Sequence, residues 1–301
     1  MNTGYKTILT TFTAWLSTLG YSNHLIRYCE FGARDFLQWL ESKQIQKINL
    51  LTDKHINEYH NHLETRQNYQ YKERLLGAGQ LNHLFFANDK LLECLHQYGL
   101  ENAPIPANRR IKNSEQERIK KIEVLTQQEI KTLYNAIPDM YQRNCFAEQQ
   151  KKQYELRLIF ALFYGCGLRL SEGYKLRIQD VDFDKKTVFV HQGKNYKDRI
   201  VPMNDNVCNT IKDYIYNFRR CLKLNHNRLF VICESSIWRR LQELQKACEN
   251  EQIKAKHLTI HNLRHSIATH LLQNGMSIEN IALFLGHGSL ESTQLYTHLV
   301  N

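Results

Sequence analysis

The spacing of apolar residues predicts helices over the first hundred positions. Hydrophobic side chains recur there every three or four residues, which is the period of an amphipathic helix. No stretch with the alternating period of a strand interrupts them. The pattern predicts four helices, at residues 3–19, at 23–41, from near residue 52, and at 73–98. The hydroxyl of Thr52 can cap the first turn of the third helix. We therefore expect residues 1–103 to form a small helical bundle.

The pattern is lost after residue 103. Residues 104–122 hold two of the four prolines and six basic residues against two acidic ones. The basic residues are Arg109, Arg110, Lys112, Arg118, Lys120 and Lys121. We interpret this segment as an extended basic linker that follows a polyanion, with an ordinary solvated loop as the alternative.

A second domain is predicted for residues 123–301. Thr126, followed three residues later by Glu129, fits a capping box at the start of a helix. Two β-rich runs joined by a turn that carries Lys194 predict a hairpin with a basic tip. The predicted elements are helices at 127–137, 146–165, 206–222 and 236–250, strands at 187–191 and 199–203, and three short helices from His261 onward, broken at Asn274-Gly275 and Gly286–Gly288. The expected fold class is mainly α with a small β-sheet.

Composition excludes several classes of protein. With 42% hydrophobic and 11% aromatic residues, the chain can bury a core and is not disordered. The longest apolar run, Leu158 to Leu168, is too short for a membrane span, which needs about 20 residues. The eight cysteines form no C-x-x-C pair, so we expect a reducing cytoplasm rather than a disulfide framework or a zinc ribbon.

The net charge of +10 favours a polyanionic partner, with nucleic acid first and an anionic membrane surface second. The charge is uneven. Residues 1–103 carry ten basic and ten acidic residues, whereas 104–122 carry a net +4 and 123–301 a net +6. If the helical domain binds DNA, it must use one face, and the candidates are Arg66, Lys72 and Arg74.

Groups that could surround a phosphate occur in four places in the second half. They are Arg169 after a glycine-containing break, Lys194 at the hairpin tip, His261 with Arg264 on one helical face, and His287 between glycines. Each alone is more often a surface or packing residue. Together such groups could stabilise the phenolate of Tyr296, nine residues after His287, and so allow it to attack a phosphodiester.

Metal chemistry is a weaker interpretation of the same residues. His261 and His265 have the i, i+4 spacing of a zinc site, but the glutamate of H-E-x-x-H is missing and no clear third ligand follows. No acidic cluster is placed to hold two metals either. We expect no metal and no cofactor.

Five motifs in order identify a family resemblance. They are G-C-G-L-R-L-S-E, G-K-x-x-K-x-R-x-V-P, H-N-L-R-H-S-I-A-T-H-L-L, L-G-H and S-T-Q-L-Y-T-H. This set resembles the tyrosine recombinases, or phage integrase family, and in particular the simple two-domain, Xer-like members. The resemblance implies a SAM-like core DNA-binding bundle at 1–103 and an α+β catalytic domain at 123–301.

The resemblance also implies roles for the phosphate ligands. Arg169 and Arg264 would clamp the scissile phosphate, and His287 would donate a hydrogen bond to it. Lys194 would protonate the 5′-hydroxyl leaving group. Lys197 and Arg199 lie in the same hairpin motif and are further candidates for binding DNA, in addition to the basic residues of the linker and of the bundle.

The nucleophile implied by the resemblance is Tyr296, which would form a 3′-phosphotyrosine. His261 would accept and return its proton. Glu172 would support the site without reacting, and His265 matches a common helix residue with no catalytic role.

The implied reaction is a transesterification that cuts and rejoins DNA without ATP, for integration, excision, inversion or dimer resolution. The expected partner is double-stranded DNA with an inverted-repeat core site, on which a homotetramer would exchange strands through a Holliday junction. Only five residues follow Tyr296, whereas many relatives continue into a helix that docks on a neighbouring subunit. We therefore expect either a truncation or assembly through other surfaces, and no separate arm-binding domain.

Three alternatives stay open at this point. A type IB topoisomerase shares the chemistry and would relax plasmids that lack any specific site. A non-catalytic DNA-binding relative would lack a catalytic residue, and none is missing. A metal-dependent hydrolase built on the histidines would lose its activity in EDTA.

Overall fold

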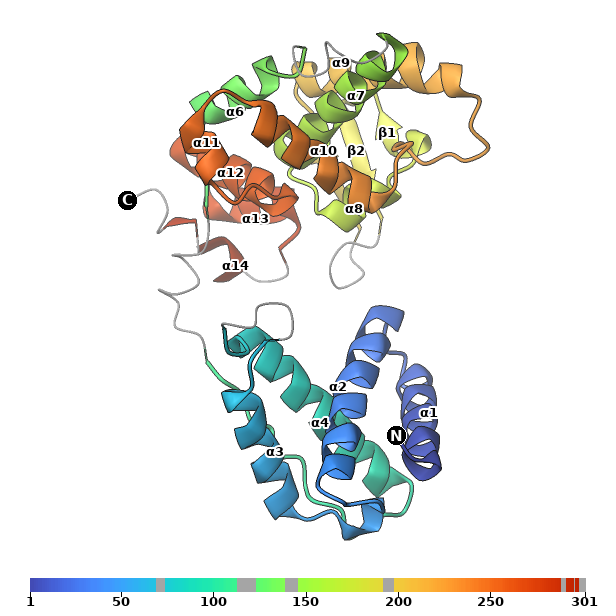
Figure 1. Ribbon diagram of the computed structural model, residues 1–301. Coiled ribbons are helices and arrows are strands. Elements are labelled where there is room, and N and C mark those ends of the chain that lie inside the picture. The colour runs from blue at the N-terminus through green and yellow to red at the C-terminus, as the bar shows by residue number, and fades with distance from the viewer. Residues whose placement is uncertain are drawn as a thin grey trace. The chain divides into compact units, whose positions relative to one another are not determined.

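The computed structural model describes residues 1–68, 74–112, 123–138, 146–191, 198–287, 291–294 and 296–297. These residues belong to two compact units, Met1–Ser114 and Glu115–Asn301 (Figure 1). Each unit has its own hydrophobic core. Within the described residues, every helix is too short or too polar to cross a membrane.

The first unit is a helical bundle, as predicted. Its helices are α1 (Thr3–Thr18), α2 (Asn23–Ser42), α3 (Asp53–Thr65) and α4 (Ala78–Gln97). Helix α4 begins five residues later than predicted, because Leu75 instead pairs with Gln67 in an isolated β-bridge. Helices α2 and α4 pack side by side (Figure 1). Gly32 of α2 lets them approach closely.

The first part of the predicted linker packs on this bundle. The side chain of Asn82 in α4 exchanges two hydrogen bonds with the backbone of Ile111, at 2.7 and 2.8 Å. Arg110 forms an ion pair with Asp89 at 3.0 Å, and Arg109 forms one with Glu64 at 2.6 Å. Each of these two arginines thus has an acidic partner within the unit but remains partly exposed, and their interpretation as DNA-binding residues stays a prediction.

The second unit combines helices with a three-stranded antiparallel sheet. Val188 in the central strand pairs with Val181 on one side and with Val201 on the other. The strands are β1 (Val181–Asp182), β2 (Thr187–Val190) and β3 (Arg199–Pro202), and the helices are α6 (Gln127–Asn135), α7 (Phe146–Ile159), α8 (Leu170–Lys175), α9 (Asp205–Asp213), α10 (Glu234–Ala247), α11 (Glu251–Ala255), α12 (Ile260–Gln273), α13 (Ile278–Leu285) and α14 (Glu291–Gln294). The predicted fold class, mainly α with a small sheet, is confirmed.

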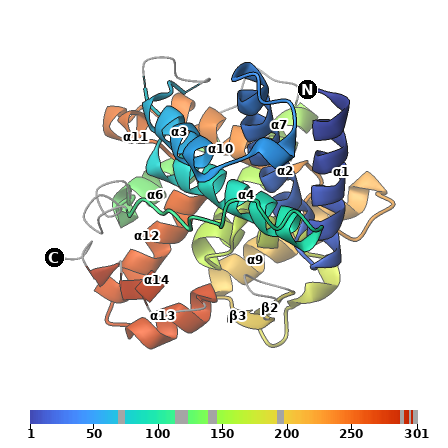
Figure 2. The same ribbon diagram turned by 90° about the horizontal axis from the view of Figure 1, so that it is seen from below.

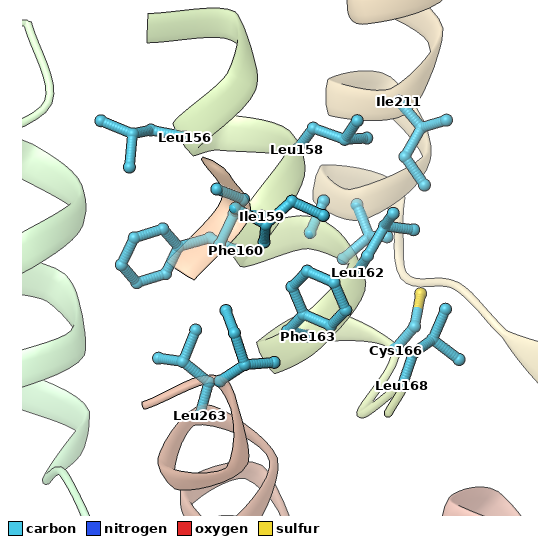
Figure 3. Close-up of a cluster of buried hydrophobic side chains, with 14 of the residues drawn as sticks. Leu156, Leu158, Ile159, Phe160, Leu162, Phe163, Cys166, Leu168, Ile211 and Leu263 are labelled. Carbon is cyan, nitrogen blue, oxygen red and sulfur yellow. The ribbon is translucent and has the colours of Figure 1, made fainter. Parts of the chain in front are cut away.

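The core of the second unit gathers around the end of α7. This helix continues into a π-helical turn, Phe160–Gly165, whose apolar side chains are buried. Figure 3 shows Phe163 of this turn among side chains that include Ile211 of α9 and Leu263 of α12. The apolar run that was predicted to end the helix at 146–165 thus lies at the centre of the core of the second unit.

The observed secondary structure differs from the predicted elements where a helix changes its pitch and where an element is short. The helix predicted at 206–222 is α9, followed by a π-helical turn at Tyr214–Phe218 and a 3₁₀ turn at Arg219–Leu222. Strand β1 and helices α8 and α11 were not predicted, because two to six residues are too few to show a period.

The last three helices bring the C-terminal residues back to the core. Helix α12 packs against the π-helical turn, and α13 contacts both α12 and β3 (Figure 2). The breaks between them fall at Asn274-Gly275 and at Gly286, as predicted, and both glycines have positive φ. This arrangement places residues from motifs more than a hundred positions apart in one region of the second unit.

We predict that Gly32→Ala destabilises the first unit by about 1–3 kcal/mol, because overpacking of a filled interface costs that much. A Cβ at this position would lie 2.5 Å from the Cβ of Ala87 in α4. Urea denaturation followed by tryptophan fluorescence would measure the effect, since Trp15 and Trp39 are buried in this unit. Gly79→Ala in α4 is the control, because its Cβ would meet no atom within 4 Å and should be neutral or stabilising. Equal stability of the two variants would contradict the close approach of α2 and α4.

Candidate active site

Three segments of the second unit present the candidate residues. Helix α12 begins at its N-cap Thr259, whose hydroxyl accepts a hydrogen bond from Asn262 N, and it places His261, Arg264 and His265 within its first two turns. Arg169 is the N-cap residue of α8. The third segment follows the C-cap of α13 and includes His287 and Tyr296.

Arg264 joins two of these segments. Its guanidinium donates to the carbonyl of Gly167 at 2.5 Å and to that of Leu285 at 2.7 Å. Gly167 has a φ of +60°, and a Cβ there would lie 2.9 Å from Leu285, so the turn before Arg169 requires glycine. Arg169 makes a similar bond to the carbonyl of Gly286 at 3.0 Å. The two arginines thus fix the loop before α8 against the end of α13.

Glu172 is the buried counter-charge of the cluster. Its carboxylate accepts from Arg169 at 2.6 Å and forms a bidentate pair with Arg199, at 2.8 and 3.0 Å. Arg264 lies 4.0 Å away. Burial alone would raise the pKa of Glu172, but the hydrogen bonds and charges of Arg199 and Arg169 outweigh it and lower the pKa to about 2.

Arg199, predicted to bind DNA, lies inside this cluster. Its side chain is 10% exposed, and its guanidinium is occupied by both oxygens of Glu172 and by the carbonyl of Phe284. The motif contained this arginine, but nothing in the sequence indicated that a hairpin strand would pair with a helix 27 positions earlier. Arg199 therefore positions the carboxylate of Glu172, which in turn pairs with Arg169.

The three histidines near this cluster are neutral at pH 7. Burial, followed by the charges of nearby arginines, lowers the pKa of His287 to about 3, and burial, His261 and Arg264 lower that of His265 to about 4. Desolvation, Arg264 and Arg169 also lower the pKa of His261. The charge of the described site at pH 7 therefore comes from three guanidiniums and one carboxylate, which leave a net +2.

Tyr296 is buried beside these histidines, with 2% of its surface exposed. Its hydroxyl lies 3.0 Å from Nδ1 of His265, and its ring stacks on that of His287 with centroids 6.2 Å apart. His287 in turn bonds through Nδ1 to the hydroxyl of Thr293 at 2.7 Å. Burial raises the pKa of the Tyr296 phenol, while the charges of Arg264 and Arg169 oppose that rise.

Sequence reasoning missed two of these contacts. Thr293 was not singled out, although it lies three residues before Tyr296 and orients His287. The contact of His265 with Tyr296 was also missed, although His265 follows Arg264 directly on the same helix.

Other predicted residues lie elsewhere or outside the described residues. Arg66 forms an ion pair with Asp35 at 2.9 Å, and its role in binding DNA stays a prediction. Arg74 and Lys112 are exposed and stay DNA-binding predictions. The residues outside the described part of the chain are Lys72, Arg118, Lys120, Lys121, Lys194 and Lys197.

No metal site is formed by the described residues. Within those ranges, no group of three or more histidine, cysteine, aspartate or glutamate side chains is arranged to hold a metal ion. His261 and His265 do lie next to each other, with ring centroids 6.2 Å apart, but among the described residues they have no third ligand.

Comparison with known proteins identifies the family. Residues 123–301 match the phage integrase family, and the chain belongs to it. The resemblance found in the five motifs is thereby confirmed. The chain is 35% identical over 202 residues to the tyrosine recombinase XerA of Pyrococcus furiosus, with 62% of this chain and 63% of that protein covered. It is 40% identical over 151 residues to the tyrosine recombinase XerD of Staphylococcus saprophyticus, with 48% and 50% covered.

The chain thus spans about half to two thirds of the length of these relatives. Two solved structures share its fold. One is the XerH site-specific recombinase bound to a palindromic difH substrate, with a TM-score of 0.69 at 16% identity, covering 90% of this chain and 75% of that one. The other is a lambda integrase tetramer bound to a Holliday junction, with a TM-score of 0.62 at 16% identity, covering 94% and 77%.

We predict that Glu172→Gln lowers the free energy of unfolding of the second unit by about 3 kcal/mol at pH 7, because one pKa unit corresponds to about 1.4 kcal/mol. A carboxyl pKa that is lowered on folding stabilises the protein above its ordinary value of 4.5, and that stabilisation is lost as the pH falls toward about 2. The deficit of the variant should therefore shrink between pH 5 and pH 3. Urea denaturation at several pH values measures it.

Glu251→Gln is the control for this prediction. Glu251 also pairs with a cation, Lys254 at 2.8 Å, but it is exposed, so its replacement should change stability little at any pH. A Glu172→Gln deficit that is the same at pH 7 and pH 3 would show that the carboxylate charge does not hold the cluster together.

Proposed function

We propose that the chain is a site-specific DNA recombinase that cuts and rejoins strands through a 3′-phosphotyrosine at Tyr296. The observation that carries the proposal is the convergence of a buried phenol with two arginines. Arg169 and Arg264 lie close enough to Tyr296 to oppose the rise of its pKa, and the residues come from motifs far apart in the sequence. Membership of the phage integrase family supports the same chemistry.

The net positive charge of the site suits a phosphodiester. Each guanidinium has five N–H donors, and the bonds to Gly167 and Leu285 use only two of those of Arg264. Donors therefore remain for the non-bridging oxygens of a phosphate, whose charge increases in the transition state. In this proposal Arg169 and Arg264 bind those oxygens, and His287 donates a hydrogen bond to one of them.

Attack by Tyr296 breaks the bond from phosphorus to the 5′-oxygen. That oxygen gains the electron pair and takes a proton, which we assign to Lys194 as the resemblance implies. The new phosphotyrosine keeps the energy of the broken bond, so the reverse attack by a 5′-hydroxyl reseals a strand without ATP. No metal or cofactor takes part in the proposed reaction.

The proposed partner is double-stranded DNA. The solved relatives named above are bound to a palindromic difH substrate and, for the lambda integrase tetramer, to a Holliday junction. These complexes support DNA with an inverted-repeat core site and a homotetramer as proposals for this chain. The exposed Arg74 and Lys112 are candidates for contact with the backbone of such DNA, and we propose that the protein acts in the cytoplasm.

We predict that the full chain forms a covalent complex with nicked duplexes that carry a randomised inverted-repeat core. The nick lets the short 5′ fragment diffuse away after cleavage, which traps the protein on DNA. Tyr296→Phe removes the nucleophilic oxygen and should abolish the complex, as seen on a denaturing gel. Tyr164→Phe is the matched control, because Tyr164 is a half-buried tyrosine that, like Tyr296, bonds to a histidine of α12, and it should leave the complex intact.

A covalent complex that persists in Tyr296→Phe would remove Tyr296 from the proposed role. Loss of the complex in EDTA would favour the metal-dependent hydrolase instead. Relaxation of a supercoiled plasmid that lacks the selected site would favour a topoisomerase.

A further inference from the structure

The hydroxyl of Tyr296 contacts a group that can accept a proton. Among the described residues, that contact joins its hydroxyl to Nδ1 of His265 at 3.0 Å, with the ring centroids 5.6 Å apart. A heavy-atom distance of this size lies within the range for direct proton transfer. The two side chains come from α12 and from the segment after α14, 31 positions apart in the sequence.

The other two histidines of the site are placed differently. His261 lies one helical turn before His265, its ring centroid is 6.2 Å from that of His265, and its side chain is exposed. The ring of His287 lies nearly parallel to that of Tyr296 with centroids 6.2 Å apart, its Nδ1 is bonded to Thr293, and within the described residues no hydrogen bond joins it to the phenol. His265 is therefore the histidine whose lone pair can point at the phenol oxygen.

We propose that His265 is a catalytic residue, the general base that takes the phenol proton of Tyr296 during strand cleavage. The O–H bond of Tyr296 breaks, its proton goes to Nδ1 of His265, and the phenol oxygen bonds to phosphorus. The electron pair of the bond to the 5′-oxygen leaves with that oxygen. In resealing, His265 returns the proton to the departing phenolate.

This assignment changes the roles expected from the sequence. His261, expected there to accept the proton of the nucleophile, is left at the exposed rim of the site, where it can contact the DNA phosphate instead. The inference rests on the proposed function, since it concerns the same cleavage step.

The surroundings of His265 suit a base that is unprotonated at neutral pH. It faces His261 and Arg264 from its own helix, His287 from the end of α13 and the phenol of Tyr296. Among the described residues, no carboxylate contacts it. Burial and these neighbours lower its pKa to about 4, so the ring keeps a free lone pair at pH 7.

The first test uses the wild-type protein without DNA. If His265 accepts the hydrogen bond, its Nδ1 carries no proton and the ring is the Nε2–H tautomer. Long-range ¹H–¹⁵N NMR on histidine-labelled protein distinguishes the two tautomers, and Tyr296→Phe assigns the signal. The proposal predicts the Nε2–H tautomer. The Nδ1–H tautomer would overturn it, because His265 would then donate to Tyr296 and have no lone pair facing it.

The second test measures the single-turnover cleavage rate of the nicked duplex against pH. His265→Asn keeps an acceptor near the position of Nδ1 but cannot take a proton. We expect a loss of about 100-fold or more at pH 7, the usual contribution of a general base. We also expect the rate of the variant to rise about tenfold per pH unit between pH 7 and 9, since hydroxide must then remove the proton, while the wild-type rate stays level.

The matched control is His270→Asn. His270 lies on the same helix, is buried, and contacts the hydroxyl of Tyr164 through Nδ1 at 2.9 Å, so its replacement disturbs the same kind of pair away from the reacting phenol. We expect wild-type rate and a level profile. A level profile in His265→Asn, or the tenfold slope in His261→Asn instead, would overturn the proposal. If the recombinase assignment itself is wrong, the wild-type chain forms no covalent complex, which separates the two failures.

Discussion

The candidate site depends on one buried carboxylate. Arg169, Arg199 and Arg264 lie close together, and three guanidiniums in a region of low dielectric repel one another unless an anion lies between them. Glu172 is that anion, and it contacts two of the three directly. Because it also caps the backbone N–H of Arg169, at 2.8 Å, it fixes the start of α8 as well as the charges. The remaining donors of Arg169 and Arg264 are thereby held in place before any phosphate is bound.

The same desolvation decides the state of the histidines. Burial and the fixed cations lower the pKa of His265 to about 4 and that of His287 to about 3, so both rings are neutral at physiological pH, and the pKa of the more exposed His261 is lowered as well. Positive charge for a phosphate then comes from the arginines, while the histidines supply lone pairs and N–H donors. Because the roles are separate, a histidine can exchange a proton with the substrate or the nucleophile while the guanidinium charges that bind the phosphate stay the same.

Sequence reasoning predicted the architecture well because the relevant signals are local. Apolar periodicity gave the bundle and α12, and glycines marked the breaks on either side of α13. The π-helical turn at Phe160–Gly165 was read as plain helix, since a change of pitch leaves no mark in an apolar run. The pairing of Arg199 with Glu172, the docking of Arg109 and Arg110 on the bundle, and the contact of His265 with Tyr296 depend on tertiary packing, and no local pattern could show them.

The most direct test of the central claim, that the phenol of this arginine cluster is the nucleophile, is to locate the DNA on the protein. The chain has no lysine or arginine after Arg264, so trypsin releases residues 265–301 as one peptide, in which Tyr296 is the only tyrosine. Mass spectrometry of the digested covalent complex should find the nucleotide on that peptide alone. A nucleotide attached to any other peptide would contradict the account.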